Sequence, residues 1–234
     1  ISSAFSGRQA VENGEIILFP KDLQFEAFTV MFNMNEFWTA YANTLFLTFY
    51  GTLWAIFVAI LGAYALSKKR LLFRKIFNFF LVFTMWFSAG ILPQYRNYLD
   101  TKDVFNSIGI TDDKWLVVIA MGMAAMNIIL LRNAFEGVPS EIEEAAIIQD
   151  IPWIKRMTHI IIPIQKSSII SGYLLPFMTC LRELSLFMLL CGQGLVLATT
   201  LDYFDEMGLY AFSSGINLIL IVVILVFNGL VNKL

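Results

Sequence analysis

The sequence predicts an all-α membrane protein, a polytopic bundle of about five transmembrane helices. Of its 234 residues, 58% are hydrophobic and 15% are charged, whereas soluble domains have about 45–50% and about 25%. Charge-free runs recur at lengths close to the roughly 20 apolar residues that cross a bilayer. Lys and Arg also gather in alternate connections between these runs, which is typical of membrane proteins.

Five segments meet the length requirement for a span, and the fourth carries polar interruptions. We expect spans, in chain order, at about residues 42–66, 76–92, 115–131, 167–190 and 211–230. The fourth segment contains Pro176 and the adjacent charges Arg182 and Glu183. A proline in a helix interior removes a hydrogen bond, so we expect a break there.

Basic residues predict how the spans are oriented. Residues 68–75 contain five Lys or Arg residues, and residues 132–166 contain four. The positive-inside rule therefore places both stretches in the cytoplasm. Residues 1–37 then form an external N-terminal segment, and residues 38–234 form one transmembrane domain. The number of predicted spans is odd, and the chain begins on the external side of the membrane. We therefore expect a sixth span upstream of this chain.

Several function classes lack support in the sequence. A net charge of −2 does not favour nucleic-acid binding. One histidine and two cysteines, Cys180 and Cys191 in apolar sequence, predict no metal site. The chain has no phosphate-binding G-x-x-x-x-G-K-[ST] stretch, so we expect it to hydrolyse no ATP itself. No catalytic residue and no bound cofactor are predicted.

A long polar segment, residues 132–166, separates the third span from the fourth. Ser140 followed by Glu143 predicts a capping box at the start of a helix. Acidic residues in its first turn suit the positive end of the helix dipole. We expect the helix to end near Asp150, which would cap a second short helix with Pro152 in its first turn and Pro163 at its close. On this pattern alone, a hairpin that only connects two spans is an equal alternative.

The spacing within this segment resembles the signature of ATP-binding-cassette importer permeases. That signature is Glu-Ala-Ala, three residues, Gly, nine residues and then Ile-x-Leu-Pro. Here Glu144, Ala145 and Ala146 match, as do Ile160 and Pro163, while Ile162 replaces Leu. Asp150 stands where the family has Gly. Gly there permits a tight turn with φ > 0, a conformation that Asp tolerates better than most other residues do.

The resemblance covers most of the chain and is greatest to the carbohydrate-importer permeases. It includes residues 15–20, 37–44, 63–70, 87–95 and 127–133. After Pro176 the sequence around Arg182 and Glu183 is more similar to permeases for ferric iron and related anions. The resemblance therefore implies a carbohydrate substrate, with ferric iron or another small anion as the alternative.

The resemblance implies a type I importer permease in the plasma membrane of a prokaryote. Its partners would be a second, homologous permease, a dimeric cytoplasmic ATPase that holds ATP and Mg²⁺, and an extracytoplasmic substrate-binding protein. Coupling helices at residues 139–163 would dock on the ATPase. The residues expected to act there are Ser140, Glu143, Glu144, Ala145, Ala146 and Asp150.

Three polar residues are candidates for the substrate path. Charges within a span are costly and usually face a bundle interior or a water-filled route, which favours Arg182 and Glu183. The alternative is that the span ends near Leu181 and the pair is structural. Asn127 in the third span is a weaker candidate, because an interhelical hydrogen bond explains it better than a substrate contact does.

Two other classes of membrane protein compete with the importer hypothesis. A secondary transporter typically has repeats with broken helices in both halves, and the sequence has no such symmetry. A membrane-embedded enzyme needs several ionisable groups at one depth, and only Arg182 and Glu183 are available.

Overall fold

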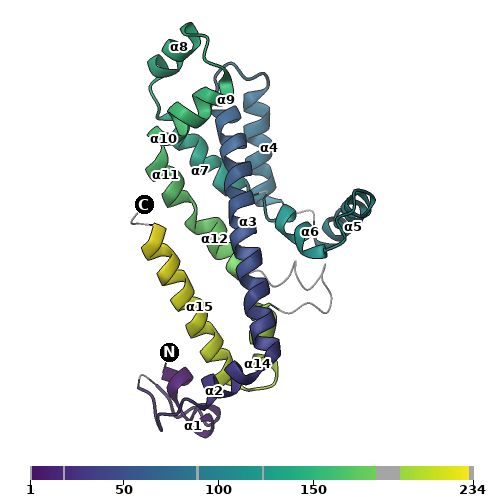
Figure 1. Ribbon diagram of the computed structural model, residues 1–234, viewed down its shortest axis with the longest axis vertical. Helices are drawn as coiled ribbons and strands as arrows, with labels where there is room; N and C mark the ends of the chain where they lie inside the picture. The colour runs from purple at the N-terminus through teal and green to yellow at the C-terminus, as the bar shows by residue number, and fades with distance from the viewer. Residues whose placement is uncertain (1, 18, 88–89, 123, 183–195, 232–234) are drawn as a thin grey trace. The chain divides into compact units, whose positions relative to one another are not determined.

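The computed structural model describes residues 2–17, 19–87, 90–122, 124–182 and 196–231. Within these ranges the chain is helical, apart from one isolated antiparallel bridge between Ser6 and Leu23. The predicted all-α fold class is therefore confirmed. The chain divides into two compact units, unit 1 with residues 1–48 and 181–234 and unit 2 with residues 49–180 (Figure 1).

Unit 1 combines the two ends of the chain. Its helices are η1 (Ser2–Phe5), α1 (Arg8–Glu12), α2 (Glu26–Asn33), the beginning of α3 (Asn35–Ser67), α14 (Leu197–Glu206) and α15 (Tyr210–Val231). Gly215 allows α15 to approach α2, since a Cβ there would lie 2.8 Å from the Met31 methyl carbon. Thr44 of α3 accepts a hydrogen bond from the Leu197 N–H at 2.9 Å, at the start of α14.

Unit 2 contains the remainder of α3 and the helices that follow it up to residue 180. Its further helices are α4 (Arg74–Trp86), α5 (Ile91–Ser107), α6 (Asp113–Ala120), α7 (Ala125–Glu136), α8 (Ser140–Ile148), α9 (Trp153–Arg156), the π-helical η2 (Met157–Ile161), α10 (Ile162–Ile164), α11 (Lys166–Gly172) and α12 (Leu174–Leu181). The buried core of this unit joins α3, α7 and η2 through Ala59, Ala63, Tyr64, Leu66, Ile128, Leu131, Phe135, Met157 and Ile161.

Among the residues that the structure describes, two helices are long and apolar enough to cross a membrane by themselves. They are α3, with 33 residues, and the 20-residue stretch Tyr210–Gly229 of α15. At 1.5 Å per residue both reach the hydrocarbon thickness of about 30 Å. The predicted first and fifth spans are therefore confirmed as continuous helices.

The predicted third span is not one straight helix. It divides into α6 and α7, which are bent by 49° relative to each other. The break contains Gly122, where a Cβ would lie 2.4 Å from Nε1 of Trp54. The indole of Trp54 occupies that space and donates a hydrogen bond to the Ile119 carbonyl at 3.2 Å. A side chain from α3 thus adds a second donor to this carbonyl, which also accepts from the Gly122 N–H at 3.1 Å.

The described part of the fourth span is also divided, although not at Pro176. Helix α11 ends at Gly172 and α12 begins at Leu174, so Pro176 lies in the first turn of α12. A proline N cannot donate to the carbonyl four residues earlier, which here belongs to Gly172. In the first helical turn this missing donor costs nothing. The break therefore precedes the proline, and the prediction of an interruption at Pro176 itself was wrong.

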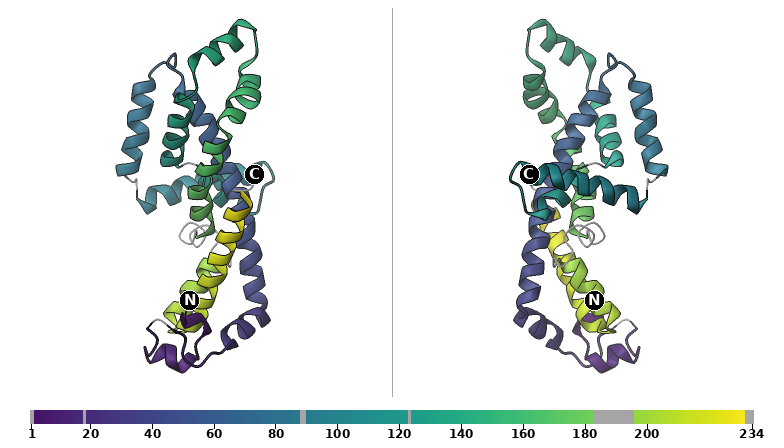
Figure 2. Two further views of the ribbon diagram at one scale, coloured as in Figure 1. Left: turned by 90° about the vertical axis from the view of Figure 1, so that its left-hand side faces the viewer. Right: turned by 90° about the vertical axis from the view of Figure 1, so that its right-hand side faces the viewer.

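The predicted second span, residues 76–92, is wrong as a continuous segment. Helix α4 ends at Trp86 after 13 residues, which is about 20 Å. A new helix, α5, begins after Gly90, whose φ of +87° strongly favours glycine. No described residue of α4 is buried, and both views of Figure 2 show this helix at the edge of unit 2.

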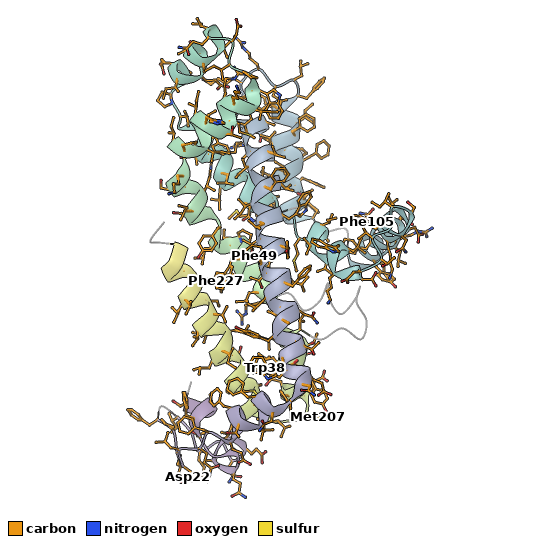
Figure 3. All side chains as sticks on the ribbon, viewed as in Figure 1. Asp22, Trp38, Phe49, Phe105, Met207 and Phe227 are labelled. Carbon is orange, nitrogen blue, oxygen red and sulfur yellow. The ribbon has the colours of Figure 1, made fainter. Side chains whose placement is uncertain are left out.

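Large apolar side chains cover the outer faces of the long helices. Only 33% of the apolar window of α3 and 28% of that of α15 are buried. Phe49 on α3, which Figure 3 labels, is 56% exposed. Faces of this kind suit contact with lipid or with other membrane-embedded chains.

Candidate coupling site

The candidate site begins with α8, at one end of unit 2 (Figure 1). The helix starts at Ser140, with Pro139 at the N-cap position (φ −55°, ψ 133°), and no side chain caps it. The predicted capping box between Ser140 and Glu143 is therefore wrong. Proline at the N-cap places Ser140 inside the first turn, so its hydroxyl is not where an N-cap oxygen would be.

The end of α8 depends on Asp150. Its φ is +51°, the left-handed conformation that the resemblance predicted for this position. The N–H of Asp150 donates to the Ile147 carbonyl and that of Ile151 to the Ala146 carbonyl, both at 3.0 Å. This pair of bonds is a Schellman motif, which satisfies the last carbonyls of a helix. The prediction of a tight turn with φ > 0 at Asp150 is confirmed.

The second helix of the segment differs from the prediction at its start and agrees with it at its end. Pro152 occupies the N-cap of α9, and no side chain, including that of Asp150, caps this helix. The helical run continues from Trp153 through the π-helical turn η2 to Ile164, one residue after Pro163. The next helical run, Lys166–Leu181, is bent by 78° relative to it. The prediction that Pro163 closes this helix is therefore confirmed to within one residue, since a proline interrupts the backbone hydrogen bonds of a helix.

The faces of α8 separate the residues of the predicted signature. Ala146 is 4% exposed and packs inward. Glu144 and Ala145 are exposed, and Ile148 is 82% exposed. An acidic, a small and a large apolar side chain thus lie together on the open surface of the helix. We refer to Glu144, Ala145 and Ile148 as the outer face of α8.

Glu143 lies in a different environment from Glu144. Its Oε2 is 2.5 Å from the Lys68 Nζ, and its Oε1 accepts a hydrogen bond from the Tyr64 hydroxyl at 3.5 Å. The Lys68 Nζ also lies 4.2 Å from the centre of the Tyr64 ring. We call these three residues the inner link. The sequence reasoning missed Tyr64 and Lys68 as partners of Glu143, although their spacing of four residues indicates a shared helical face.

A second polar cluster joins α3, α4 and α7 at the same end of unit 2. Arg74 donates to the Leu66 carbonyl at 2.7 Å and pairs with Glu136. Arg132 lies 3.5 Å from the same Glu136 carboxylate and donates to the Asn78 side chain at 2.6 Å. The two basic stretches that the positive-inside rule assigned to one side therefore meet in space.

The predicted substrate-path residues are not brought together within one unit. Asn127 is buried in α7 of unit 2. Arg182 is exposed in the turn after α12 and belongs to unit 1. Glu183 lies outside the described residues. Their role in a substrate path stays a prediction.

The described part of the chain contains no group of three or more His, Cys, Asp or Glu side chains that could hold a metal ion. Cys180 is buried at the end of α12. If Gly51 of α3 were replaced by another residue, the added Cβ would lie 2.9 Å from the Cys180 sulfur. Cys180 thus packs against α3, and Cys191 lies outside the described residues.

The comparison with known families agrees with this arrangement of helices. Residues 28–234 match the model of the binding-protein-dependent transport system inner membrane component. The chain belongs to this family. The permease is thus an inner membrane component of a transport system. The predicted type I importer permease fold is confirmed, and a solved relative supports it as well.

That solved relative is a bacterial ABC transporter involved in the import of the acidic polysaccharide alginate. One of its chains superposes with a TM-score of 0.73 and 28% identity, covering 99% of the permease and 87% of that chain. The polygalacturonan/rhamnogalacturonan transport system permease protein of Bacillus subtilis is 31% identical over 146 residues, 62% of this chain and 49% of the relative. The diacetylchitobiose uptake system permease protein of Streptomyces coelicolor is 24% identical over 187 residues, 79% of this chain and 66% of the relative. The permease therefore spans about half to two thirds of the length of these two curated relatives.

Proposed function

We propose that the permease is a membrane subunit of an ATP-driven importer for carbohydrates in the plasma membrane of a prokaryote. It forms part of the substrate path and couples that path to cytoplasmic ATPase subunits, which bind ATP and Mg²⁺. A second permease subunit and an extracytoplasmic substrate-binding protein complete the importer. The family match over residues 28–234 supports this assignment.

The outer face of α8 is the observation that carries the coupling role. Glu144 and Ala145 belong to the motif that resembles the ATPase-docking signature, and they are exposed together with Ile148. The Schellman motif at Asp150 ends the helix with its backbone satisfied. A helix that is closed in this way and open on one face fits a groove on a soluble partner, with Ala145 allowing close approach.

The names of the relatives support a carbohydrate as the substrate. They concern polygalacturonan and rhamnogalacturonan, diacetylchitobiose, and alginate. Ferric iron or a small anion is the second candidate, and of these two the positive charge of the exposed Arg182 favours an anion. If the path uses Arg182, the variant Arg182→Ala in an assembled complex should raise the KM for uptake. Wild-type kinetics would assign Arg182 a structural role instead.

Docking is tested by reversing the charge at Glu144. The permease is copurified with its ATPase and second permease subunits, and uptake is measured in the same strain. Glu144→Lys should reduce ATPase copurification and uptake by about tenfold, since an interfacial pair becomes a repulsion. Glu206→Lys, which makes the same charge reversal at an exposed position of α14 in unit 1, is the control and should have little effect. Normal ATPase association and uptake in Glu144→Lys would refute the docking role.

A further inference from the structure

Glu143 and Glu144 are neighbours in sequence, yet they face different surroundings. The side chain of Glu143 is 24% exposed and lies against Lys68, whose side chain is 27% exposed. Glu144 is exposed on the outer face. Because successive residues of a helix point in directions about 100° apart, a helix that presents Glu144 to a partner turns Glu143 aside. The two carboxylates therefore serve different surfaces.

The inner link joins α8 to the end of a transmembrane helix. Tyr64 lies in the last turn of α3, and Lys68 follows directly after its final residue, Ser67. The Lys68 N–H donates to the Ala65 carbonyl at 3.3 Å, and the Ser67 hydroxyl donates to the Tyr64 carbonyl at 2.8 Å. The backbone that carries both partners of Glu143 is thus held to the last turn of α3. A displacement of Glu143 would act on that turn.

The inner link is a polar connection between α8 and the end of α3. The second cluster, with Arg74, Arg132 and Glu136, joins α3, α4 and α7 and contains no residue of α8. Ala146 is the buried residue of α8, and its methyl group offers little apolar area. A pair that is about three quarters buried is screened less by solvent than a surface pair.

We propose that Lys68, Tyr64 and Glu143 transmit the movement of the coupling helix to transmembrane helix α3. Glu143 is then a positioning residue that does not touch the ATPase. When ATPase closure displaces α8, the ion pair and the tyrosine hydrogen bond move the cytoplasmic end of α3 with it. Since α3 has 33 residues, about 50 Å of helix, this displacement reaches across the membrane. The proposal rests on the proposed docking of α8 on an ATPase.

The test separates transmission from docking in the complete complex reconstituted into liposomes. Three quantities are measured: ATPase copurification, the rate of ATP hydrolysis, and substrate taken up per ATP hydrolysed. Glu143→Gln and Lys68→Met should retain the ATPase but lower uptake per ATP by about fivefold, the factor that corresponds to about 1 kcal/mol for one ion pair. Tyr64→Phe should lower it less, since the 3.5 Å hydrogen bond is long.

Matched controls come from exposed residues outside α8. Glu206→Gln and Lys69→Met make the same chemical changes at exposed positions and should leave uptake per ATP unchanged. The exchanged pair Lys68→Glu with Glu143→Lys should restore at least about half of the lost coupling, as a double-mutant cycle requires for a direct interaction. Should Glu143→Gln fail to assemble, an assembled exchanged pair with normal coupling still supports the proposal.

Three results would overturn the proposal. The first is that Glu143→Gln and Lys68→Met take up as much substrate per ATP as the control variants do. The second is loss of ATPase copurification in Glu143→Gln, which would place Glu143 on the docking surface. The third is an exchanged pair that assembles but stays uncoupled. The docking hypothesis is tested separately: it fails if Glu144→Lys retains normal ATPase association and uptake.

Discussion

At the scale of single residues, Asp150 keeps the backbone conformation of its motif position although it replaces the family's glycine. The backbone there has φ +51°, a region that excludes most side chains through contact of Cβ with the backbone. Asp is among the few residues that tolerate it, because a short polar side chain can form local hydrogen bonds. The turn between α8 and α9 therefore keeps the shape that glycine would allow.

Substitution of Asp150 tests this explanation. Asp150→Gly should keep or slightly raise the thermal stability of the purified complex, because glycine adopts φ > 0 without steric cost. Asp150→Val should destabilise it by about 1–2 kcal/mol, since a β-branched residue is strained there. The measurement is the midpoint of thermal unfolding in detergent. Gln149→Val, at φ −82°, is the control, and an equal loss in both Val variants would contradict the role of φ.

At the scale of elements, the break between α6 and α7 lies where a side chain from α3 intrudes. The indole of Trp54 occupies the place of a side chain at Gly122 and takes the Ile119 carbonyl as its acceptor. Similarly, the sulfur of Cys180 lies against Gly51. Glycine at these positions lets two helices approach closely, as small residues commonly do in membrane proteins.

Gly122→Ala should therefore destabilise the permease. The added Cβ would lie 2.4 Å from Trp54 Nε1, so the ring must move and lose its hydrogen bond, at a cost of about 1–3 kcal/mol. Thermal unfolding of the purified complex measures the loss. Gly172→Ala is the control, because its Cβ would meet Leu131 at an ordinary 3.5 Å. Combination with Trp54→Leu should recover part of the loss, and a full additive loss would contradict the contact.

At the scale of the whole molecule, the distribution of charge predicts the side of the membrane on which each loop lies. Lys68 with Glu143, and Arg74 with Glu136, bring the two basic stretches together. Helix α5, which the positive-inside rule places externally, is rich in polar residues and begins after Gly90. The coupling helix must lie in the cytoplasm for the proposed function to hold.

Labelling of single cysteines tests this topology. In a background in which Cys180 and Cys191 are replaced by Ser, the variants Lys69→Cys and Gln149→Cys should react with a membrane-impermeant maleimide only in inverted vesicles. Asp103→Cys, in α5, should react in intact cells. All three positions are exposed, so differences in burial do not explain the pattern. Labelling of Gln149→Cys from outside the cell would contradict the orientation that the basic residues predict.

Local physical chemistry was sufficient for several features of this protein. Length and apolarity determined the two continuous spans in α3 and α15, because a helix satisfies its own backbone in lipid. The motif spacing indicated the coupling helix and the left-handed residue Asp150, since that conformation is a property of a single position. These features depend on neighbours along the chain.

Only the tertiary structure decided the rest. Ser140 and Glu143 form a capping box on paper, but Glu143 pairs with Lys68, a partner 75 residues away. The break between α6 and α7 lies where Trp54 from α3 occupies the space beside Gly122. Sequence patterns indicate local periodicity. Ion pairs and close packing join residues that are far apart along the chain, and no local pattern identifies such partners.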